Sequence, residues 1–271
     1  MSGAARSKAI PSQGQSLVTI DKIRGIGSAL SIGMRTAAAK FPWAPYHHGD
    51  TNAGSGMNEE VSALVGEPVP GSPVVAVRTA EAIGLPGFRG MFCEMDQTRA
   101  KTLATKHLAG RTDCTVFCGD NAEFVDAFAE SIRRSGDRPQ YAVGSIVVDP
   151  NGWFTRNKNN SGVPVQQLLA FGHEFPRVDV VLNLNVRTYQ MMRQHPNFQP
   201  MSAPEIMAAM GKSHWLLSAP KSVGGDKFII MIGRNFATGD HRRLGLFRAD
   251  SEEGRAALQA VEPKRQGALS L

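Results

Sequence analysis

Short apolar runs alternate with amphipathic stretches along most of the chain, and this alternation predicts an α/β sheet. The run at residues 141–148 is nearly all apolar, as expected for a central parallel strand that is buried on both faces. The last two runs flank a turn around Gly224–Gly225–Asp226, which predicts an antiparallel hairpin. Strands are expected at residues 46–49, 90–94, 114–118, 141–148, 178–184, 214–219 and 227–233.

Helical patterns lie between these runs, so we expect a mostly parallel, Rossmann-like sheet with helices on both faces and an antiparallel C-terminal hairpin. Gly71-Ser72-Pro73 predicts a helix start, with Ser72 as N-cap and Pro73 at the first helical position, and Gly84 ends that helix. Helices are expected at residues 73–83, 98–108, 122–134, 163–171 and 204–211.

Two segments interrupt this regular alternation. Residues 17–39 have a helical pattern, but Gly25, Gly27 and Gly33 each weaken it by about 1 kcal/mol relative to alanine. We therefore expect two short helices over the sheet edge. Residues 57–70 contain several glycines and prolines and predict an inserted loop.

The composition is that of an ordinary globular protein. The chain has 271 residues, of which 42% are hydrophobic and 20% charged, so we expect one domain over residues 18–271 after a polar arm at residues 1–17. Three cysteines without a CxxC pair argue against a disulfide scaffold and a structural zinc site, and no metal site is expected. No signal-peptide or membrane-spanning run is present, so we expect a cytoplasmic protein.

The formal charge of +6 and the pI of about 9.4 favour polyanionic partners such as DNA or RNA. The basic residues are spread along the chain rather than gathered in one dense run. A solvated basic face is therefore an alternative to a nucleic-acid surface.

Four loops at the ends of expected strands carry the candidate chemistry. In an open α/β sheet such loops converge on one crevice, so their order suggests one nucleotide-like ligand. They are Asp50-Thr51-Asn52-Ala53-Gly54-Ser55-Gly56, Phe92-Cys93-Glu94, Cys118-Gly119-Asp120-Asn121 and Ile146-Val147-Val148-Asp149-Pro150.

The first two loops suit the sugar side of a nucleoside. Gly54 and Gly56 would allow the backbone to approach the ligand closely, although a plain tight turn also explains them. Asp50 would anchor that loop or bind the ligand through water. Glu94 directly follows a strand and could accept both ribose hydroxyl protons, with a helix N-cap as the alternative.

The other two loops suit the base and the reaction. Asp120 and Asn121 could bind an adenine edge, or Asp120 could cap the following helix. Asp149 and the Pro150 carbonyl could hold a substrate amine, and Trp153 could stack on a flat base. A simple Asp-Pro-Asn-Gly turn is the alternative reading of this last loop.

Residues Asp50–Gly56 resemble the D-T-H-A-G-A-G signature of the large-subunit ribosomal RNA adenine-N6 methyltransferases. Gly71-Ser72-Pro73 before an apolar helix matches that group and also the three-Cys-motif partner family. Asp149-Pro150-Asn151-Gly152 is similar to the D-P-F-G of the latter family, and Val180–Leu184 to its L-L-I-N-F strand.

The resemblance implies an S-adenosylmethionine (SAM)-dependent methyltransferase of the class I, Rossmann-like type. Its cofactor would lie on Gly54, Gly56, Glu94, Asp120 and Asn121, and its acceptor would be an amino group of a base in nucleic acid. Two alternatives remain open: a SAM-binding partner subunit without catalysis of its own, which would need a protein partner, and another nucleotide-dependent enzyme that uses the same crevice.

Overall fold

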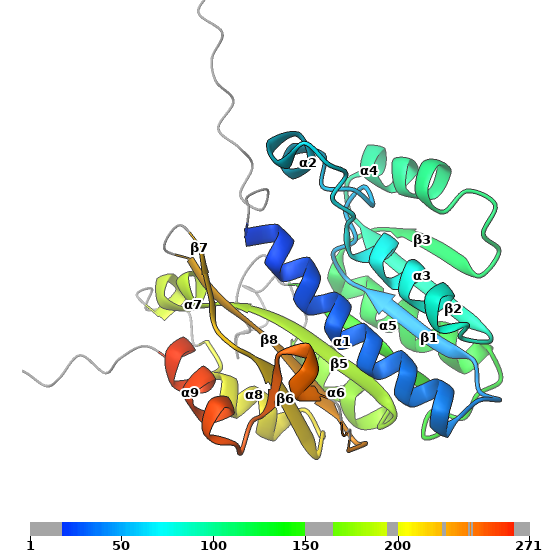
Figure 1. Ribbon diagram of the computed structural model, residues 1–271. Helices are drawn as coiled ribbons and strands as arrows, with labels where there is room; N and C mark the ends of the chain where they lie inside the picture. The colour runs from blue at the N-terminus through cyan, green and yellow to red at the C-terminus, as the bar shows by residue number, and fades with distance from the viewer. Residues whose placement is uncertain are drawn as a thin grey trace, which may run out of the picture.

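In the part of the chain that the structure describes, nine strands form one central sheet (Figure 1). The computed structural model describes residues 18–149, 165–193, 200–223, 226–237, 239 and 241–262. The strand order is β3-β2-β1-β4-β5-β8-β6-β9, and β7 pairs with β8. Strands β1 to β5 are parallel, whereas β8 is antiparallel to both β5 and β6. The predicted Rossmann-like sheet with an antiparallel C-terminal part is therefore confirmed.

The strands lie close to the predicted apolar runs. They are β1 (Tyr46–Asp50), β2 (Phe88–Glu94), β3 (Cys114–Cys118), β4 (Val143–Val148), β5 (Val178–Asn185), β6 (His214–Ser218), β7 (Lys221–Val223), β8 (Asp226–Arg234) and β9 (Leu246–Arg248). All six residues of β4 are buried, as its apolar sequence predicts for a central strand.

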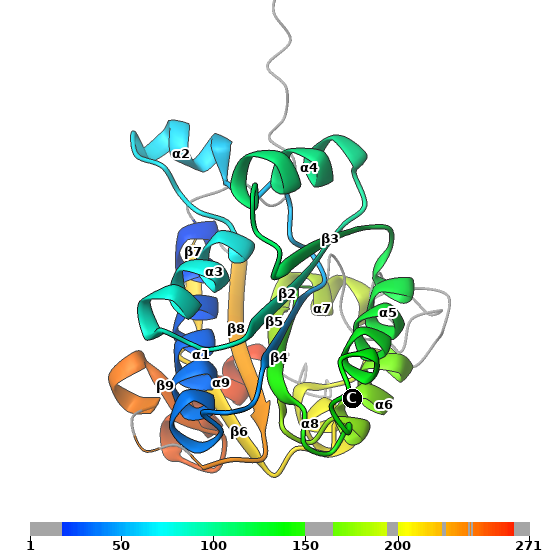
Figure 2. The ribbon, with the colours of Figure 1, turned by 90° about the vertical axis from the view of Figure 1, so that its right-hand side faces the viewer.

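Helices cover both faces of the sheet. Figure 2 shows the sheet between the two layers of helices. On one face, α1 (Val18–Lys40) packs beside α3 (Ser72–Ile83) over β1, β4 and β5. The helices of the opposite face form a second hydrophobic core with β4 and β5. They are α5 (Asn121–Arg134), α6 (Val165–Glu174), α7 (Val186–Arg193), α8 (Ala203–Ala209) and α9 (Glu252–Val261). None of the helices in the described residues is long and apolar enough to cross a membrane.

The remaining helices border this sandwich. α2 (Glu59–Val65) lies in the connection after β1, and α4 (Gln97–Thr102) follows β2 and continues as the π-helical turn η1 (Leu103–His107). A short 3₁₀ turn, η2 (His241–Leu244), precedes β9. The predicted inserted loop at residues 57–70 is wrong in part, because α2 lies within it. The N-cap of α3 is Gly71, one residue before the predicted Ser72.

The first helix also differs from its prediction. α1 is one continuous helix of 23 residues on the face of the sheet, rather than two short helices over its edge. Its glycines lie where other elements come close. A Cβ at Gly25 would be 2.8 Å from Ile230 Cγ1, and one at Gly33 would be 2.9 Å from Tyr46 Oη. Close packing onto the sheet therefore outweighs the low helix propensity of glycine.

The polar first strand is completely buried. His48 Nδ1 lies 2.9 Å from Ser145 Oγ on β4, and His47 Nε2 lies 2.9 Å from Asp137 Oδ2. Burial lowers the pKa of His48 to about 3, so the ring is neutral at physiological pH. Each histidine thus has one hydrogen-bond partner in a strand where valine or isoleucine is usual, whereas His48 Nε2 has none among the described residues.

Candidate functional site

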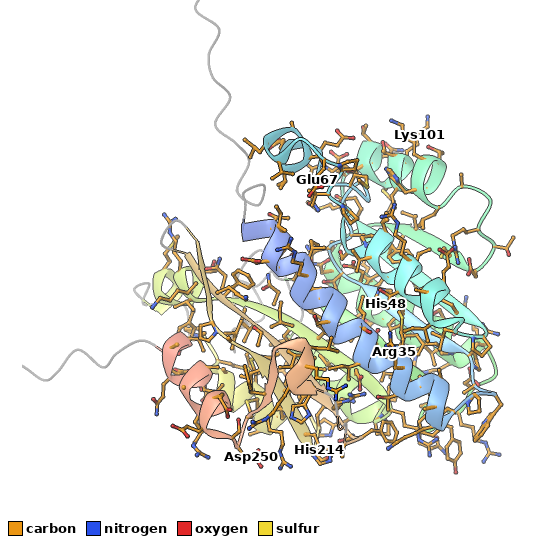
Figure 3. The ribbon with its side chains drawn as sticks, viewed as in Figure 1. Arg35, His48, Glu67, Lys101, His214 and Asp250 are labelled. Atoms are coloured by element: carbon orange, nitrogen blue, oxygen red, sulfur yellow. The ribbon has the colours of Figure 1, made fainter. Side chains whose placement is uncertain are left out.

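The chain reverses its direction of travel across the sheet between β1 and β4. From β1 the parallel strands proceed to β2 and β3 on one side, and from β4 to β5 on the other. This is the topological switch point at which open α/β sheets bind ligands, beyond the carboxyl ends of the strands. In Figure 3, Glu67 and Lys101 mark this carboxyl edge, whereas His214 and Asp250 lie at the opposite, amino-terminal edge.

The loop after β1 lies over the ends of both neighbouring strands. Thr51 N donates to Val147 O of β4 at 3.0 Å, and Ala53 N donates to Cys93 O of β2 at 2.8 Å. Asn52 extends the link to β4, because its amide nitrogen, in the orientation that satisfies its neighbours, donates to Asp149 O at 2.9 Å. The loop is thus fixed by backbone contacts at the switch point.

The two candidate glycines have different surroundings. Both have a positive φ, +65° at Gly54 and +93° at Gly56, a conformation that favours glycine. A Cβ at Gly54 would meet no atom within 4 Å, so this backbone faces open space. A Cβ at Gly56 would lie 2.9 Å from both His107 Cδ2 and Leu103 Cδ1. Gly56 thus allows close packing against η1, and Gly54 leaves room for a ligand.

Asp50 ends β1 and is fully buried. Its Oδ1 accepts a hydrogen bond from Asn52 N at 3.0 Å, which anchors the loop in an Asx-type turn. Burial raises the pKa of Asp50 to about 6, and the neighbouring Asp149 carboxylate contributes to the increase. Oδ2 of Asp50 accepts no hydrogen bond from the described residues.

Glu94 lies at the carboxyl end of β2, next to the loop that contains Gly54. Its Oε1 accepts a hydrogen bond from Asp96 N at 2.8 Å, and Asp96 in turn caps α4. The N-cap alternative for Glu94 is therefore taken by Asp96. The Glu94 side chain is held by its own loop at the edge of the crevice.

Asp120 and Asn121 follow β3. Asp120 is the N-cap of α5, because its Oδ1 accepts from Ala122 N at 2.9 Å and from Glu123 N at 3.0 Å. Asn121 points toward the loops after β1 and β2: its Nδ2 lies 3.4 Å from the side-chain amide of Asn52, and its Oδ1 lies 3.8 Å from Cys93 Sγ. The loops after β1, β2 and β3 therefore meet at Asn121.

Asp149 follows β4, and both of its carboxylate oxygens have partners. Lys22 Nζ on α1 lies 2.6 Å from Oδ2, and Asn183 Nδ2 on β5 donates to Oδ1 at 2.6 Å. Oδ1 of the buried Asn183 accepts no hydrogen bond within the described part of the chain. Pro150 and Trp153, the other two predicted reaction-site residues, lie outside the described residues.

Lys22 and Asn183 were not among the predicted site residues. Asn183 interrupts the apolar run of β5, and a polar residue in a buried strand is a signal that could have identified it. Lys22 gives no comparable signal, because a lysine in the first turns of a helix is usually solvated. It reaches Asp149 because α1 leads into β1 and therefore begins at the carboxyl edge.

The chemistry of the switch point is compatible with a ligand that donates hydrogen bonds, such as one with an ammonium group. Asp50 Oδ2 and Asn183 Oδ1 are buried acceptors near Asp149, and an unsatisfied buried acceptor favours a ligand or water that donates hydrogen bonds. The open space beside Gly54 could admit the nucleoside. Among the described residues, no group of three or more His, Cys, Asp and Glu side chains could hold a metal ion.

Comparison with solved structures finds chains that align with most of this protein. Protein LPL1258 of Legionella pneumophila aligns with 83% of this chain and 88% of its own, with a TM-score of 0.53 and 14% sequence identity. Human methyltransferase-like protein 13 in complex with S-adenosylhomocysteine (SAH) aligns with 91% of this chain and 96% of its own, at 13% identity and a TM-score of 0.43.

Magnesium protoporphyrin IX methyltransferase from Synechocystis, with bound SAM, aligns with 84% of this chain and 86% of its own, at 9% identity and a TM-score of 0.40. No family model matches the chain, and no curated protein matches it in sequence. At 14% identity and a TM-score of 0.53, the alignment with LPL1258 shows a shared fold and no more.

Proposed function

We propose that this protein is a SAM-dependent methyltransferase that binds its cofactor at the switch point between β1 and β4. The observation that carries the proposal is the meeting of four strand-end loops there. The loop after β1 contacts β2 through Ala53, β4 through Thr51 and the loop after β3 through Asn52. The resemblance of Asp50–Gly56 to a methyltransferase signature supports SAM as the ligand.

Each residue has a proposed role in binding. Gly54 leaves space for the nucleoside, and the Glu94 carboxylate accepts hydrogen bonds from the ribose hydroxyls. Asn121 binds the adenine edge, while Asp120 fixes the start of α5 beneath it. The buried acceptors of Asp50 and Asn183 bind the charged amino-acid end.

SAM, when bound, supplies an activated methyl group for an in-line displacement, a reaction that depends mainly on alignment. The chain then has to hold the acceptor amine in line and exclude water. We assign this to Asp149 and to the Pro150 and Trp153 loop that follows it. Because Lys22 and Asn183 already bind the Asp149 carboxylate, Asp149 would receive an amine only when Lys22 moves away.

We propose nucleic acid as the acceptor, with an amino group of a base as the methylated atom. The net charge of +6 and the signature resemblance support this class. The direct test is incubation of the protein with tritiated SAM and separate pools of DNA, RNA and cellular protein. Label in a nucleic-acid pool is the expected result, and label confined to protein would contradict the assignment.

Both oxygens of the Asp149 carboxylate already have partners, and this favours a second candidate, a SAM-binding subunit that needs a protein partner for catalysis. In that case the wild-type protein would bind SAH but label none of the pools. Asp149→Ala separates the two candidates further. In a self-sufficient enzyme it should lower methyl transfer by about 10²-fold or more, since positioning of the amine is lost, while SAH affinity stays within a few-fold.

A further inference from the structure

Aromatic and cationic side chains form a continuous cluster at the amino-terminal edge of the sheet. Phe41 precedes β1, Tyr141 precedes β4 and Arg177 precedes β5, so they lie where these parallel strands begin. Phe236 follows the antiparallel β8 and reaches the same edge. The crevice with Asp50 and Asp149 is at the opposite edge, so this cluster is separate from the proposed cofactor site.

The members of the cluster are in direct contact. The Arg177 guanidinium lies between two rings, 5.0 Å from the Phe41 centroid and 4.9 Å from the Tyr141 centroid. Phe41 also contacts Trp43 at 6.4 Å and Phe236 at 5.2 Å between ring centroids. Four separate segments thus build one surface of flat rings around a cation.

Two of these rings are left largely in water. Trp43 is 79% exposed and Tyr141 53% exposed, so neither contributes much to a hydrophobic core. Large aromatic side chains that are exposed together commonly mark a binding surface. Their free faces can stack on a planar group of a ligand, as Phe41 and Tyr141 already stack on Arg177.

The charge around the rings is positive. Lys40 lies 5.4 Å above the Phe236 ring, Arg138 lies in the turn that leads to Tyr141, and Arg89 is near the start of β2. Within the described residues, none of these cations or Arg177 forms an ion pair. Of the nearby carboxylates, Glu174 forms an ion pair with Arg133, and Asp137 accepts hydrogen bonds from the buried His47 and from Ser135.

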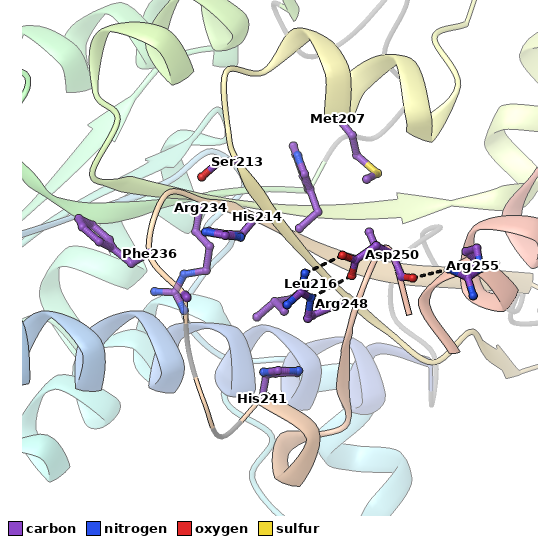
Figure 4. A pocket seen from close by; sticks show the side chains of 13 residues that line it. Met207, Ser213, His214, Leu216, Arg234, Phe236, His241, Arg248, Asp250 and Arg255 are labelled. Carbon is purple, nitrogen blue, oxygen red and sulfur yellow. Dashed lines mark hydrogen bonds and ion pairs between the residues drawn. The ribbon is translucent and has the colours of Figure 1, made fainter. Parts of the chain in front are cut away.

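A pocket of about 550 Å³ adjoins the cluster, since Phe236 lines it (Figure 4). Its wall also contains His214, His241, Arg248 and Arg255. Asp250 binds Arg248 with both carboxylate oxygens, at 2.9 and 2.6 Å, and Arg255 also donates to its backbone carbonyl. The pocket thus continues this edge beyond the rings with a mainly apolar lining that also carries charged side chains.

We propose that this surface, which consists of Lys40, Phe41, Trp43, Arg89, Arg138, Tyr141, Arg177 and Phe236, binds single-stranded nucleic acid. Its bases stack on Trp43 and Tyr141, and its phosphates lie near the unpaired cations. Exposed π faces interleaved with cations match a ligand that alternates flat rings with negative charge. An acidic peptide would satisfy the cations but would leave the aromatic faces without partners.

The test uses the full-length protein and a fluorescein-labelled oligouridylate of about 20 nucleotides, a length that spans a typical single-strand site. Fluorescence anisotropy at low salt should show binding that weakens as salt increases. The double variant Trp43→Ala, Tyr141→Ala should bind at least about tenfold more weakly, because two stacking surfaces are lost. The single variant Trp43→Phe, in which Tyr141 is unchanged, should retain most of the affinity.

Variants that remove positive charge show at which edge of the sheet the oligonucleotide binds. Lys40→Ala with Arg138→Ala removes two cations from this surface, and Lys101→Ala with Lys106→Ala removes two from the opposite edge. Only the first pair should weaken binding. SAH affinity, measured on the same variants, should not change, so failure of this proposal is distinguishable from failure of the methyltransferase proposal.

Any of the following would overturn the proposal: no oligouridylate binding by the wild-type protein, unchanged binding by the double aromatic variant, or tighter binding of poly-glutamate than of oligouridylate. A larger loss in the Lys101, Lys106 pair would also overturn it, because the strand would then lie at the carboxyl edge.

Discussion

At the scale of single residues, Glu94 gives the sharpest test of the cofactor site. Glu94→Gln keeps an oxygen that can accept from Asp96 N, so the loop should remain in place. The variant loses the charge that strengthens hydrogen bonds to the ribose, which are worth about 1.5–3 kcal/mol each before compensation. SAH affinity measured by calorimetry should therefore fall at least about tenfold, and the melting temperature of the free protein should barely move.

Glu252→Gln is the matched control for this change, because it removes the same charge from an exposed position on α9. It should leave SAH binding intact. Equal affinities for wild-type protein and Glu94→Gln would remove Glu94 from the site.

Gly54 can be tested against a glycine of the same conformation. Gly54 and Gly110 both have a positive φ, +65° and +76°, and a Cβ at either would meet no atom within 4 Å. Gly54→Val and Gly110→Val should therefore cost similar backbone strain. Only Gly54→Val should also block SAH, because its side chain would occupy the ligand space. Normal SAH binding by folded Gly54→Val would place the ligand elsewhere.

Asp50 should make the stability of the protein depend on pH. Its pKa in the folded protein is about 6, above the ordinary value of 3.8, so folding favours the protonated carboxyl group. The stability that the protonated carboxyl group contributes is fully present below about pH 4 and is lost as the pH rises to about pH 6. Over this range the free energy of unfolding should fall by up to about 3 kcal/mol.

Asp50→Asn cannot ionise, so the free energy of unfolding of wild-type protein minus that of the variant should decrease from about pH 4 to about pH 6 and then level off. Urea unfolding of both proteins across this range measures the difference. A difference that does not vary with pH would show that Asp50 ionises as freely in the folded protein as in the unfolded chain.

At the scale of elements, α1 separates helix propensity from packing. Gly25→Ala would place a Cβ 2.8 Å from Ile230 Cγ1, whereas Gly27→Ala would place one 3.2 Å from Val75 Cγ1. Alanine gains about 1 kcal/mol of helix propensity at either position. At Gly25 overpacking should cost about 1–3 kcal/mol and outweigh this gain.

Thermal or chemical unfolding should thus rank Gly27→Ala above Gly25→Ala in stability. The reverse order would mean that α1 can shift away from β8 without cost.

The elements that the sequence predicted well have strong burial signals. The apolar run of β4 is buried on both faces, and the Gly71-Ser72-Pro73 signal begins α3 within one residue of its prediction. β7 and β9 have only three residues each and were missed, because such short strands contain no periodicity. α1 was divided in two because its glycines serve tertiary contacts that local propensity does not include.

The candidate site, like the fold, was predictable from sequence only in part. Residues that directly follow strands could be placed from sequence, because strand ends of a parallel sheet share one edge. Lys22 could not, since its contact with Asp149 depends on how α1 crosses the sheet. The engagement of both Asp149 oxygens likewise follows from tertiary structure, and it changes the proposed role of that residue.

At the scale of the whole molecule, the two edges of the sheet have different chemistry. The carboxyl edge has buried acceptors around a glycine-rich loop, and the amino-terminal edge has exposed rings and unpaired cations. If both proposals hold, a nucleic-acid substrate contacts both edges of the sheet, and its contacts extend well beyond the reaction site.

The central claim is that the switch-point crevice binds SAM, and calorimetric titration of the intact wild-type protein with SAH tests it most directly. We expect a single site with a micromolar dissociation constant. SAH at about a hundred times that concentration should stabilise the fold by about 2.7 kcal/mol, visible as a higher melting temperature. A folded protein that gives no binding heat and no thermal shift with SAH would contradict the account.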